Sequence, residues 1–348
     1  MKPPKEGYRV AVVGASSLLG KELVAVLGEG KFPVSRLITL DTDEEEPELP
    51  IIDLSGAAAT AVEESEVRAS ELDFVFLAAR PRQCPAFLSS WQEQPGPTPC
   101  RIIDLAGGGL GDAPSRVSIP FLDRRFPAGG VVSTPVGVYV SAHPAVIVIS
   151  GLLLRLAARF PVKSAVAQVF VSASESGSRG IEELQKQTVN LLSFQKIPRQ
   201  VFGAQLAFNL LSRLGRTGTG EMATLEARLR RELHDYLGER VHRPALRLFQ
   251  VPVFYSVGVS LYVETAEPIA PEAAAAALAG ERVRVRRSAQ DPPTPVEVTG
   301  SSDIQVDSIA SDSVHLTGLW LWALADNFHL AATNALELAA SLGERPKA

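Results

Sequence analysis

The N-terminal segment is the feature that most constrains what this chain can fold into. A short apolar run, Tyr8–Val13, leads directly into Gly14, and apolar residues at helical spacing follow over residues 18–27. A glycine directly after a strand permits a tight turn, and a second glycine in the helix, here Gly20, lets helix and strand pack closely. The pattern predicts a strand, a turn and a helix of the kind that opens a dinucleotide-binding α/β domain.

The loop between this strand and helix has the spacing GxxSxxG, so that Ser17 stands where a dinucleotide loop usually has its middle glycine. The free N–H groups at the start of the helix and the positive end of its dipole would face a pyrophosphate. The predicted cofactor-contacting residues of this loop are Gly14, Ala15, Ser16, Ser17, Leu18, Leu19 and Gly20.

An acidic stretch follows the second predicted strand, residues 37–40. Its first member, Asp41, comes 21 residues after Gly20. A carboxylate at this place hydrogen-bonds a ribose 2′-OH and repels a 2′-phosphate. We therefore expect a bound nucleotide to be NAD rather than NADP. A solvated acidic turn with no ligand is the alternative.

Composition excludes several classes of protein. The chain has 34 Lys and Arg residues against 39 Asp and Glu residues, and its net charge of -5 argues against a nucleic-acid binder or a polybasic membrane-surface protein. With two cysteines and five histidines in no metal-binding spacing, we expect no metal site. We expect a cytoplasmic protein without a signal peptide.

The order of predicted elements indicates two domains. Further buried strands are expected at 74–79 and 101–105, and strands alternating with helices predict a parallel sheet. In the second half we expect strands at 166–171, 246–253 and 257–263, and helices at 182–192, 220–237, 268–280 and 320–342. The charged side chains of the 220–237 helix are expected to form a solvent-exposed face. The predicted fold class is α/β: a Rossmann-type dinucleotide-binding domain, residues 1–134 plus 319–348, with an inserted α+β domain, residues 135–318, built on a mixed sheet.

Six segments, in the right order and spacing, resemble the aspartate-semialdehyde dehydrogenase family. They are GASSLLGKELVAVL at 14–27, FPV at 32–34, AFNLL at 207–211, VPV at 251–253, SLYVET at 260–265 and ADN at 325–327. The resemblance implies an NADPH-linked reductive dephosphorylation of β-aspartyl phosphate, or its reverse, within amino-acid biosynthesis. It also implies a homodimer formed through the central domain, and a cofactor contact from Asn327.

The catalytic pattern of that family breaks in this chain. The family uses a cysteine thiolate to form an acyl thioester and a histidine for proton transfer. The cysteine position falls on Val146 or a neighbour, and the histidine position falls on Val257. Substrate-binding positions are also changed: Ala173 replaces a glutamine, Gln250 replaces an arginine, the 220–223 segment lacks a lysine, and an expected phosphate-binding arginine falls near Gly109 or Leu110.

These departures favour a non-catalytic homologue, most similar to the Usg-type subgroup. Such a protein is expected to keep dimerisation and NAD binding, and to act as a sensor or as the partner of another protein. An active NAD(P)-dependent oxidoreductase on a different aldehyde or oxo substrate is the rival, and a purely structural interaction protein is the third interpretation. His143, Glu175 and Arg179 are candidates for replacement chemistry, although a structural histidine and a helix-capping loop also explain these residues. Cys84, beside basic residues, is a further nucleophile candidate with little else to mark it.

Overall fold

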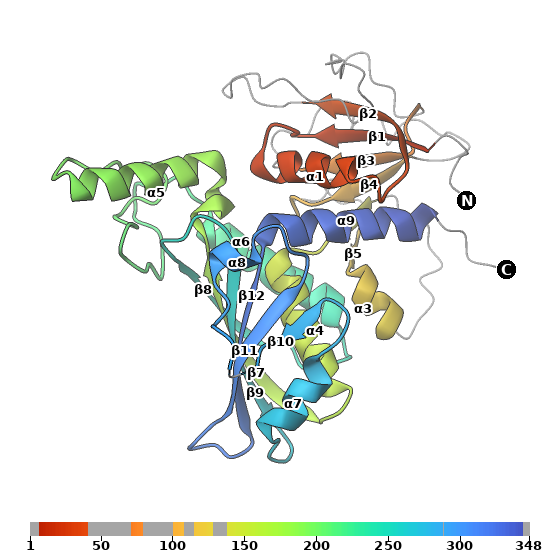
Figure 1. Ribbon diagram of the computed structural model, residues 1–348, viewed down its shortest axis with the longest axis vertical. Coiled ribbons are helices and arrows are strands. Elements are labelled where there is room, and N and C mark those ends of the chain that lie inside the picture. Colours follow the sequence, from red (N-terminus) through yellow and green to blue (C-terminus); the bar gives the residue numbers. More distant parts are fainter. Residues whose placement is uncertain are drawn as a thin grey trace. The chain divides into compact units, whose positions relative to one another are not determined.

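The computed structural model describes residues 7–40, 71–78, 100–107, 115–127, 138–287 and 289–343 (Figure 1). The chain forms two compact units. Unit 1 comprises Met1–Ala142 together with Ala331–Ala348, and unit 2 comprises His143–Leu330.

Unit 1 is built on a parallel sheet with strand order β2-β1-β3-β4-β6-β5, in which every described pairing is parallel. Its elements are β1 (Tyr8–Val13), α1 (Leu18–Gly28), β2 (Val34–Leu40), β3 (Phe74–Leu77), β4 (Arg101–Asp104), β5 (Ser115–Ser118), α3 (Pro120–Arg125) and β6 (Val138–Ser141). The sheet order changes direction at β1, whose neighbours are β2 and β3. In open parallel sheets the crevice at such a point, beyond the carboxyl ends of the strands, is where nucleotides bind.

Both faces of this sheet are covered, which explains why its strands are apolar throughout rather than alternating. On one face Val10 and Val12 pack with Leu23 of α1 and with Ala335 of α9 (Asn327–Gly343). The opposite face is a second apolar cluster that includes Val13. The dinucleotide-type α/β fold predicted from the N-terminal segment is confirmed.

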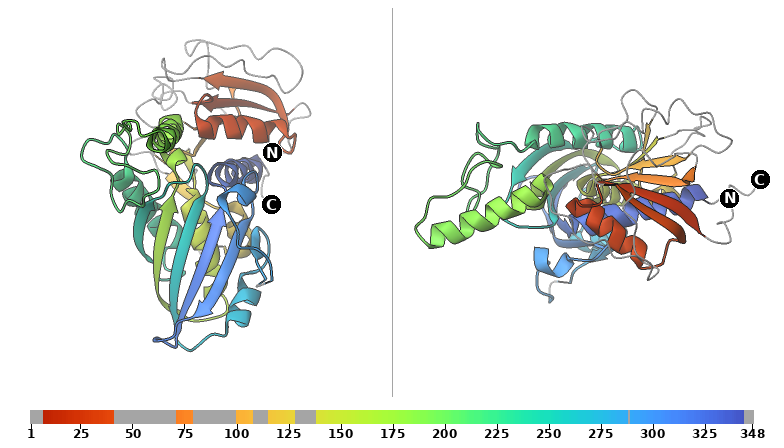
Figure 2. Two further views of the ribbon diagram at one scale, coloured as in Figure 1. Left: turned by 60° about the vertical axis from the view of Figure 1, so that its left-hand side comes forward. Right: turned by 90° about the horizontal axis from the view of Figure 1, so that it is seen from above.

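Unit 2 is built on a mixed sheet with strand order β10-β11-β12-β9-β7-β8 (Figures 1 and 2). Its strands are β7 (Val162–Val171), β8 (Ala245–Gln250), β9 (Val257–Thr265), β10 (Val283–Val285), β11 (Ile304–Ser311) and β12 (Gly318–Ala325). Its helices are α4 (Pro144–Ala157), the 3₁₀ turn η4 (Ala173–Ser176), α5 (Gly177–Leu192), α6 (Met222–Leu237), α7 (Pro271–Leu278) and α8 (Pro295–Val298). Helix α4, almost entirely buried, packs against β7, β9 and β12. The predicted mixed sheet in the second half is confirmed.

The segment 320–342, predicted as one helix, is a strand followed by a helix. Strand β12 pairs along its whole length with β9, and α9 starts only at Asn327. The strand alternates between buried Leu319, Leu321 and Ala323 and the more exposed Trp320 and Trp322. Because β12 belongs to the second sheet, residues 319–330 lie in unit 2 and not in the first domain, where the sequence placed them.

The remaining predicted helices are present with small shifts of their ends. In the described ranges, no helix combines the length and the apolar character needed to cross a membrane.

Candidate functional site

The glycines of the first loop have the conformations that the sequence argument requires. Gly14 has a φ of +77°, a left-handed conformation that favours glycine. A Cβ on Gly20 would lie 2.1 Å from the carbonyl oxygen of Gly14, so no larger residue allows α1 to approach the strand end this closely. The turn and the helix packing of a dinucleotide loop are therefore both present.

Ser17, the residue that replaces the middle glycine, is the N-cap of α1. Its Oγ accepts the N–H of Gly20 at 3.0 Å and donates to the carbonyl oxygen of Ala78 at 3.3 Å. The hydroxyl thus joins the start of α1 to the residue that follows β3. In the first turn this cap leaves the N–H groups of Leu18 and Leu19 for a phosphate, and the loop fits a dinucleotide in this respect.

The other two predicted cofactor residues, Asp41 and Asn327, are not part of this loop. Asp41 lies outside the described residues, as do Cys84, Gly109 and Leu110. Asn327 lies in unit 2, where it is buried and uses both ends of its amide. Its Oδ1 accepts the N–H of Ser256 at 2.9 Å, and its Nδ2 donates to Ser174 Oγ at 3.1 Å. These contacts give Asn327 a structural role within its unit.

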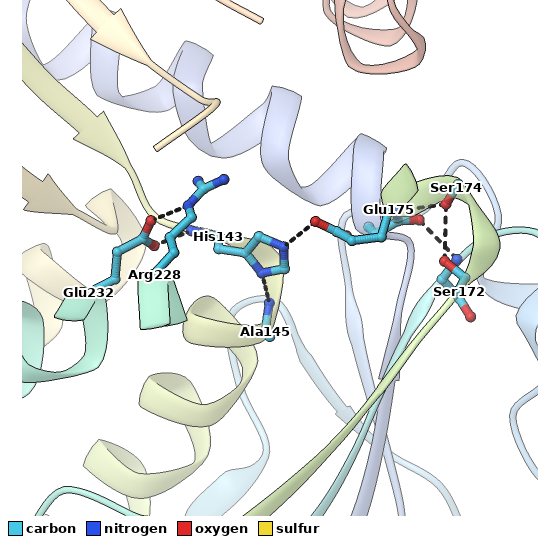
Figure 3. Close-up of polar contacts among 9 residues, drawn as sticks. His143, Ala145, Ser172, Ser174, Glu175, Arg228 and Glu232 are labelled. Atoms are coloured by element: carbon cyan, nitrogen blue, oxygen red, sulfur yellow. Dashed lines mark hydrogen bonds and ion pairs between the residues drawn. The ribbon is translucent and has the colours of Figure 1, made fainter. Parts of the chain in front are cut away.

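His143 is the N-cap of α4 and lies at the centre of a polar cluster (Figure 3). Its Nδ1 accepts the N–H of Ala145 at 3.1 Å, and its Nε2 lies 3.2 Å from Oε1 of Glu175. An Nδ1 that accepts a hydrogen bond carries no proton, so the proton of the neutral ring is on Nε2, which donates it to Glu175. Both ring nitrogens are therefore engaged, and no lone pair is left to serve as a general base in this geometry.

Glu232 of α6 is a member of this cluster that the sequence analysis missed. Its Oε2 accepts the backbone N–H of His143 at 2.7 Å, and its Oε1 accepts from Arg228 Nε at 2.6 Å (Figure 3). The carboxylate is buried, so the prediction of a wholly solvated α6 is wrong at this position. The i, i+4 spacing of Arg228 and Glu232, in register with buried Leu229 and Leu233, is the signal that could have revealed it.

The polar segment 172–180, interpreted from the sequence as a capping loop, is helical from Ala173 onward. Residues Ala173–Ser176 form a 3₁₀ turn and α5 starts at Gly177, so that Ser178 and Arg179 lie within the helix. Ser176 is at the N-cap position, but its side chain makes no cap hydrogen bond. Of the three candidates for replacement chemistry, the structure brings together His143 and Glu175, while Arg179 is exposed.

Val146 and Val257, the positions to which the resemblance assigns the catalytic cysteine and histidine, are part of the core of unit 2. Val146, in the first turn of α4, has no exposed surface, and Val257, the first residue of β9, is 2% exposed. Gln250, where the resemblance implies a family arginine, is also buried, and its Nε2 donates to the carbonyl oxygen of Val171 at 2.9 Å. All three side chains are used for packing or internal hydrogen bonding.

Cys100 is no substitute nucleophile. Burial, followed by the negative charge of Asp73, raises the pKa of its thiol to about 12. The thiolate, which is the reactive form, is therefore negligible near neutral pH. In the part of the chain that the structure describes, no group of three or more His, Cys, Asp or Glu side chains is placed to hold a metal ion.

Comparisons with known proteins agree with this fold. Residues 153–329 match the family model for the dimerisation domain of semialdehyde dehydrogenases. The chain therefore belongs to the semialdehyde dehydrogenase family.

Individual relatives match over nearly the whole chain. A USG-1 protein homolog of Pseudomonas aeruginosa is 26% identical, with 94% of this chain and 96% of the relative covered. The solved structure of a probable aspartate-semialdehyde dehydrogenase from the same species has a TM-score of 0.82 at 25% identity, covering 97% of this chain and 98% of the other. The structure of a Candida albicans aspartate-semialdehyde dehydrogenase with NADP shares the fold, with a TM-score of 0.65, 14% identity and coverage of 97% and 98%.

Proposed function

We propose that this chain is an aspartate-semialdehyde dehydrogenase homologue that does not carry out the family reaction and keeps dimerisation and nucleotide binding. The observation that carries the proposal is the burial of Val146 and Val257 at the positions that the resemblance assigns to the cysteine and the histidine. An aliphatic side chain supplies neither a nucleophile nor a proton-transfer group. By analogy with nucleophile deletions in hydrolases, the loss of the thiolate alone costs roughly 10⁶-fold in rate, or about 8 kcal/mol of barrier.

The groups near these positions do not replace that machinery. His143 is held by Ala145 and Glu175 through its two ring nitrogens. The hydroxyls of Ser172 and Ser174 bond each other at 3.0 Å, and Asn327 donates to Ser174. A nucleophilic hydroxyl requires a base within hydrogen-bonding distance, and these contacts pair the serines with each other and with an amide.

The proposal that a nucleotide still binds rests on the loop of unit 1. Gly14, Gly20 and the Ser17 cap give a turn and a helix N-terminus that suit a pyrophosphate. A relative binds NADP, whereas the acidic stretch that starts at Asp41 favours NAD in this chain. Titration of the protein with NADH and NADPH, followed by nucleotide fluorescence, tests the preference. Tighter binding of NADPH would refute the charge argument.

The homodimer is proposed to form through the open face of the second sheet. Helices α4, α6 and α7 pack against strands of this sheet, and the opposite face carries half-exposed aromatic side chains. Phe170 stacks on Phe249 at 5.7 Å between ring centroids, and Tyr262 lies 4.8 Å from Trp320. Such aromatic patches are typical of protein interfaces.

Genetic complementation tests the proposed loss of activity. A bacterial strain without its own aspartate-semialdehyde dehydrogenase should stay auxotrophic when it expresses this chain in soluble form, because the thioester step has no nucleophile. The chain of an active family member, expressed from the same vector, is the positive control. Restored growth would instead favour the rival, an oxidoreductase with replacement chemistry. A purified-protein survey of other aldehydes with NAD and NADP would detect the same rival acting on a different substrate.

A further inference from the structure

Helix α5 and the segment after it form an arm of unit 2, defined here as residues 177–211. The helix extends away from the second sheet, and the following segment runs back along it (Figures 1 and 2). The buried side of the helix is narrow and holds Gly180, Glu183, Leu184 and Gln187.

Two buried polar side chains fix the returning segment to the helix. The Glu183 carboxylate accepts the N–H groups of Val201 at 2.7 Å and Phe202 at 3.1 Å. The Gln187 amide makes four bonds to the backbone of the segment, accepting from Leu206 and Ala207 and donating to Pro198 and Ala204. These hydrogen bonds hold the arm in one conformation, so that its surface is preorganised for binding.

Phe194 lies directly beyond the end of α5, and two of its features are unfavourable for the isolated folded chain. Its side chain is 99% exposed, and its φ is +56°, where glycine or asparagine is preferred. Leu192, 70% exposed, and Val189, 54% exposed, precede it at the same end of the helix. An apolar surface thus stands at the outer end of the arm.

Phe208, at the other end of the returning segment, repeats the combination. It is 66% exposed with a φ of +60°, and Leu210 close by is 53% exposed. On left-handed backbone a glycine avoids the strain that a phenylalanine incurs, and an exposed ring buries little apolar surface in exchange. Its presence at two positions of one rigid arm indicates a contact made outside the isolated chain.

We propose that Phe194 and Phe208 dock on a second copy of this chain, so that the arm extends the dimer contact. This inference rests on the homodimer of the proposed function. We assign a second copy as the binding partner of this surface because both phenylalanines lie within 153–329, the segment that matches a dimerisation domain. In a two-fold dimer each arm contact is made twice, so that two phenylalanines supply four aromatic anchors.

Substitution by glycine separates docking from folding. Phe194→Gly and Phe208→Gly remove the aromatic ring and relieve the positive-φ strain. We expect each to raise the dimer dissociation constant about tenfold or more, measured by sedimentation equilibrium. At concentrations where the chains are monomeric, the thermal midpoint should stay the same or rise. A residue needed only for folding would lower that midpoint and leave association unchanged. The matched control is Val296→Ser, which removes an 85% exposed apolar side chain from α8.

Photo-crosslinking directly identifies the molecule that contacts position 194. A benzoylphenylalanine at position 194, in a mixture of isotopically heavy and light chains, should give heavy–light cross-linked peptides. Cross-links only within one chain, or dissociation constants of both glycine variants equal to that of the wild type, would overturn the arm proposal while the homodimer stands. A wild-type chain that is monomeric throughout would remove the homodimer itself, and the arm contact with it.

Discussion

The Nε2 atom of His143 lies 3.2 Å from Oε1 of Glu175, and this contact joins the start of α4 to the turn before α5. The other ring nitrogen caps α4 through the N–H of Ala145, and Glu232 accepts the backbone N–H of the same histidine. His143 therefore holds the start of α4, an almost entirely buried helix of unit 2, in place.

Replacement of His143 by alanine should destabilise the protein. The helix loses its side-chain cap, which costs about 1–2 kcal/mol of unfolding free energy. His143→Asn should recover most of this loss because asparagine is a good N-cap. Urea denaturation followed by circular dichroism measures both variants. Equal stability of His143→Ala and the wild type would show that the cap contributes nothing.

Replacement of Glu232 by alanine should have a larger effect. It removes the acceptor that Arg228 Nε and the backbone N–H of His143 share in a buried place, at a cost of about 3 kcal/mol. Glu232→Gln keeps an acceptor and should lose less. A double-mutant cycle with Arg228→Met isolates the pair, and strictly additive losses would contradict the coupling seen in the structure.

Removal of the Ser150 hydroxyl should stabilise the protein. This side chain is fully buried in α4, and its Oγ has no hydrogen-bond partner in the described structure. Ser150→Ala removes the desolvation cost of an unpaired hydroxyl, and we expect a gain of about 1 kcal/mol in unfolding free energy. Denaturant titration measures it. A loss of stability would indicate a partner for this hydroxyl.

The thiol of Cys100 should be inert in the folded protein. Its pKa of about 12 lies above the value of 9.0 for a free thiol, so that the folded chain keeps a proton that the unfolded chain releases. Stability is unaffected by this group below pH 9 and should fall as the pH rises from about 9 toward 12, by up to about 1.4 kcal/mol per pH unit. Comparing Cys100→Ala with the wild type over this range isolates the effect, and rapid alkylation of Cys100 in the native protein at pH 8 would contradict it.

The elements that depend on local sequence were predictable, and those that depend on distant partners were not. Gly14 and Gly20 revealed the first turn because their conformations follow from residues beside them. The sequence predicts a helix over β12 because its leucine and alanine residues favour helices, although their alternation with tryptophan indicates a strand. The sequence predicts a solvated charge at Glu232 because its second partner, His143, lies 89 residues away in the chain.

The valines at positions 146 and 257 were identified through the resemblance to a family rather than through any local pattern. The predicted strand 257–263 contains Val257, as found, while no helix is predicted over Val146, which lies in α4. Neither local pattern points to chemistry at these positions. Only the alignment with family motifs turns two ordinary core residues into evidence about function.

The central claim is tested most directly by the rate of NADPH formation from aspartate β-semialdehyde, phosphate and NADP, with protein purified from a host that lacks its own dehydrogenase. We predict no rate above the protein-free blank at any enzyme concentration, with the same result when NAD replaces NADP. A rate that rises in proportion to the concentration of this protein would contradict the account.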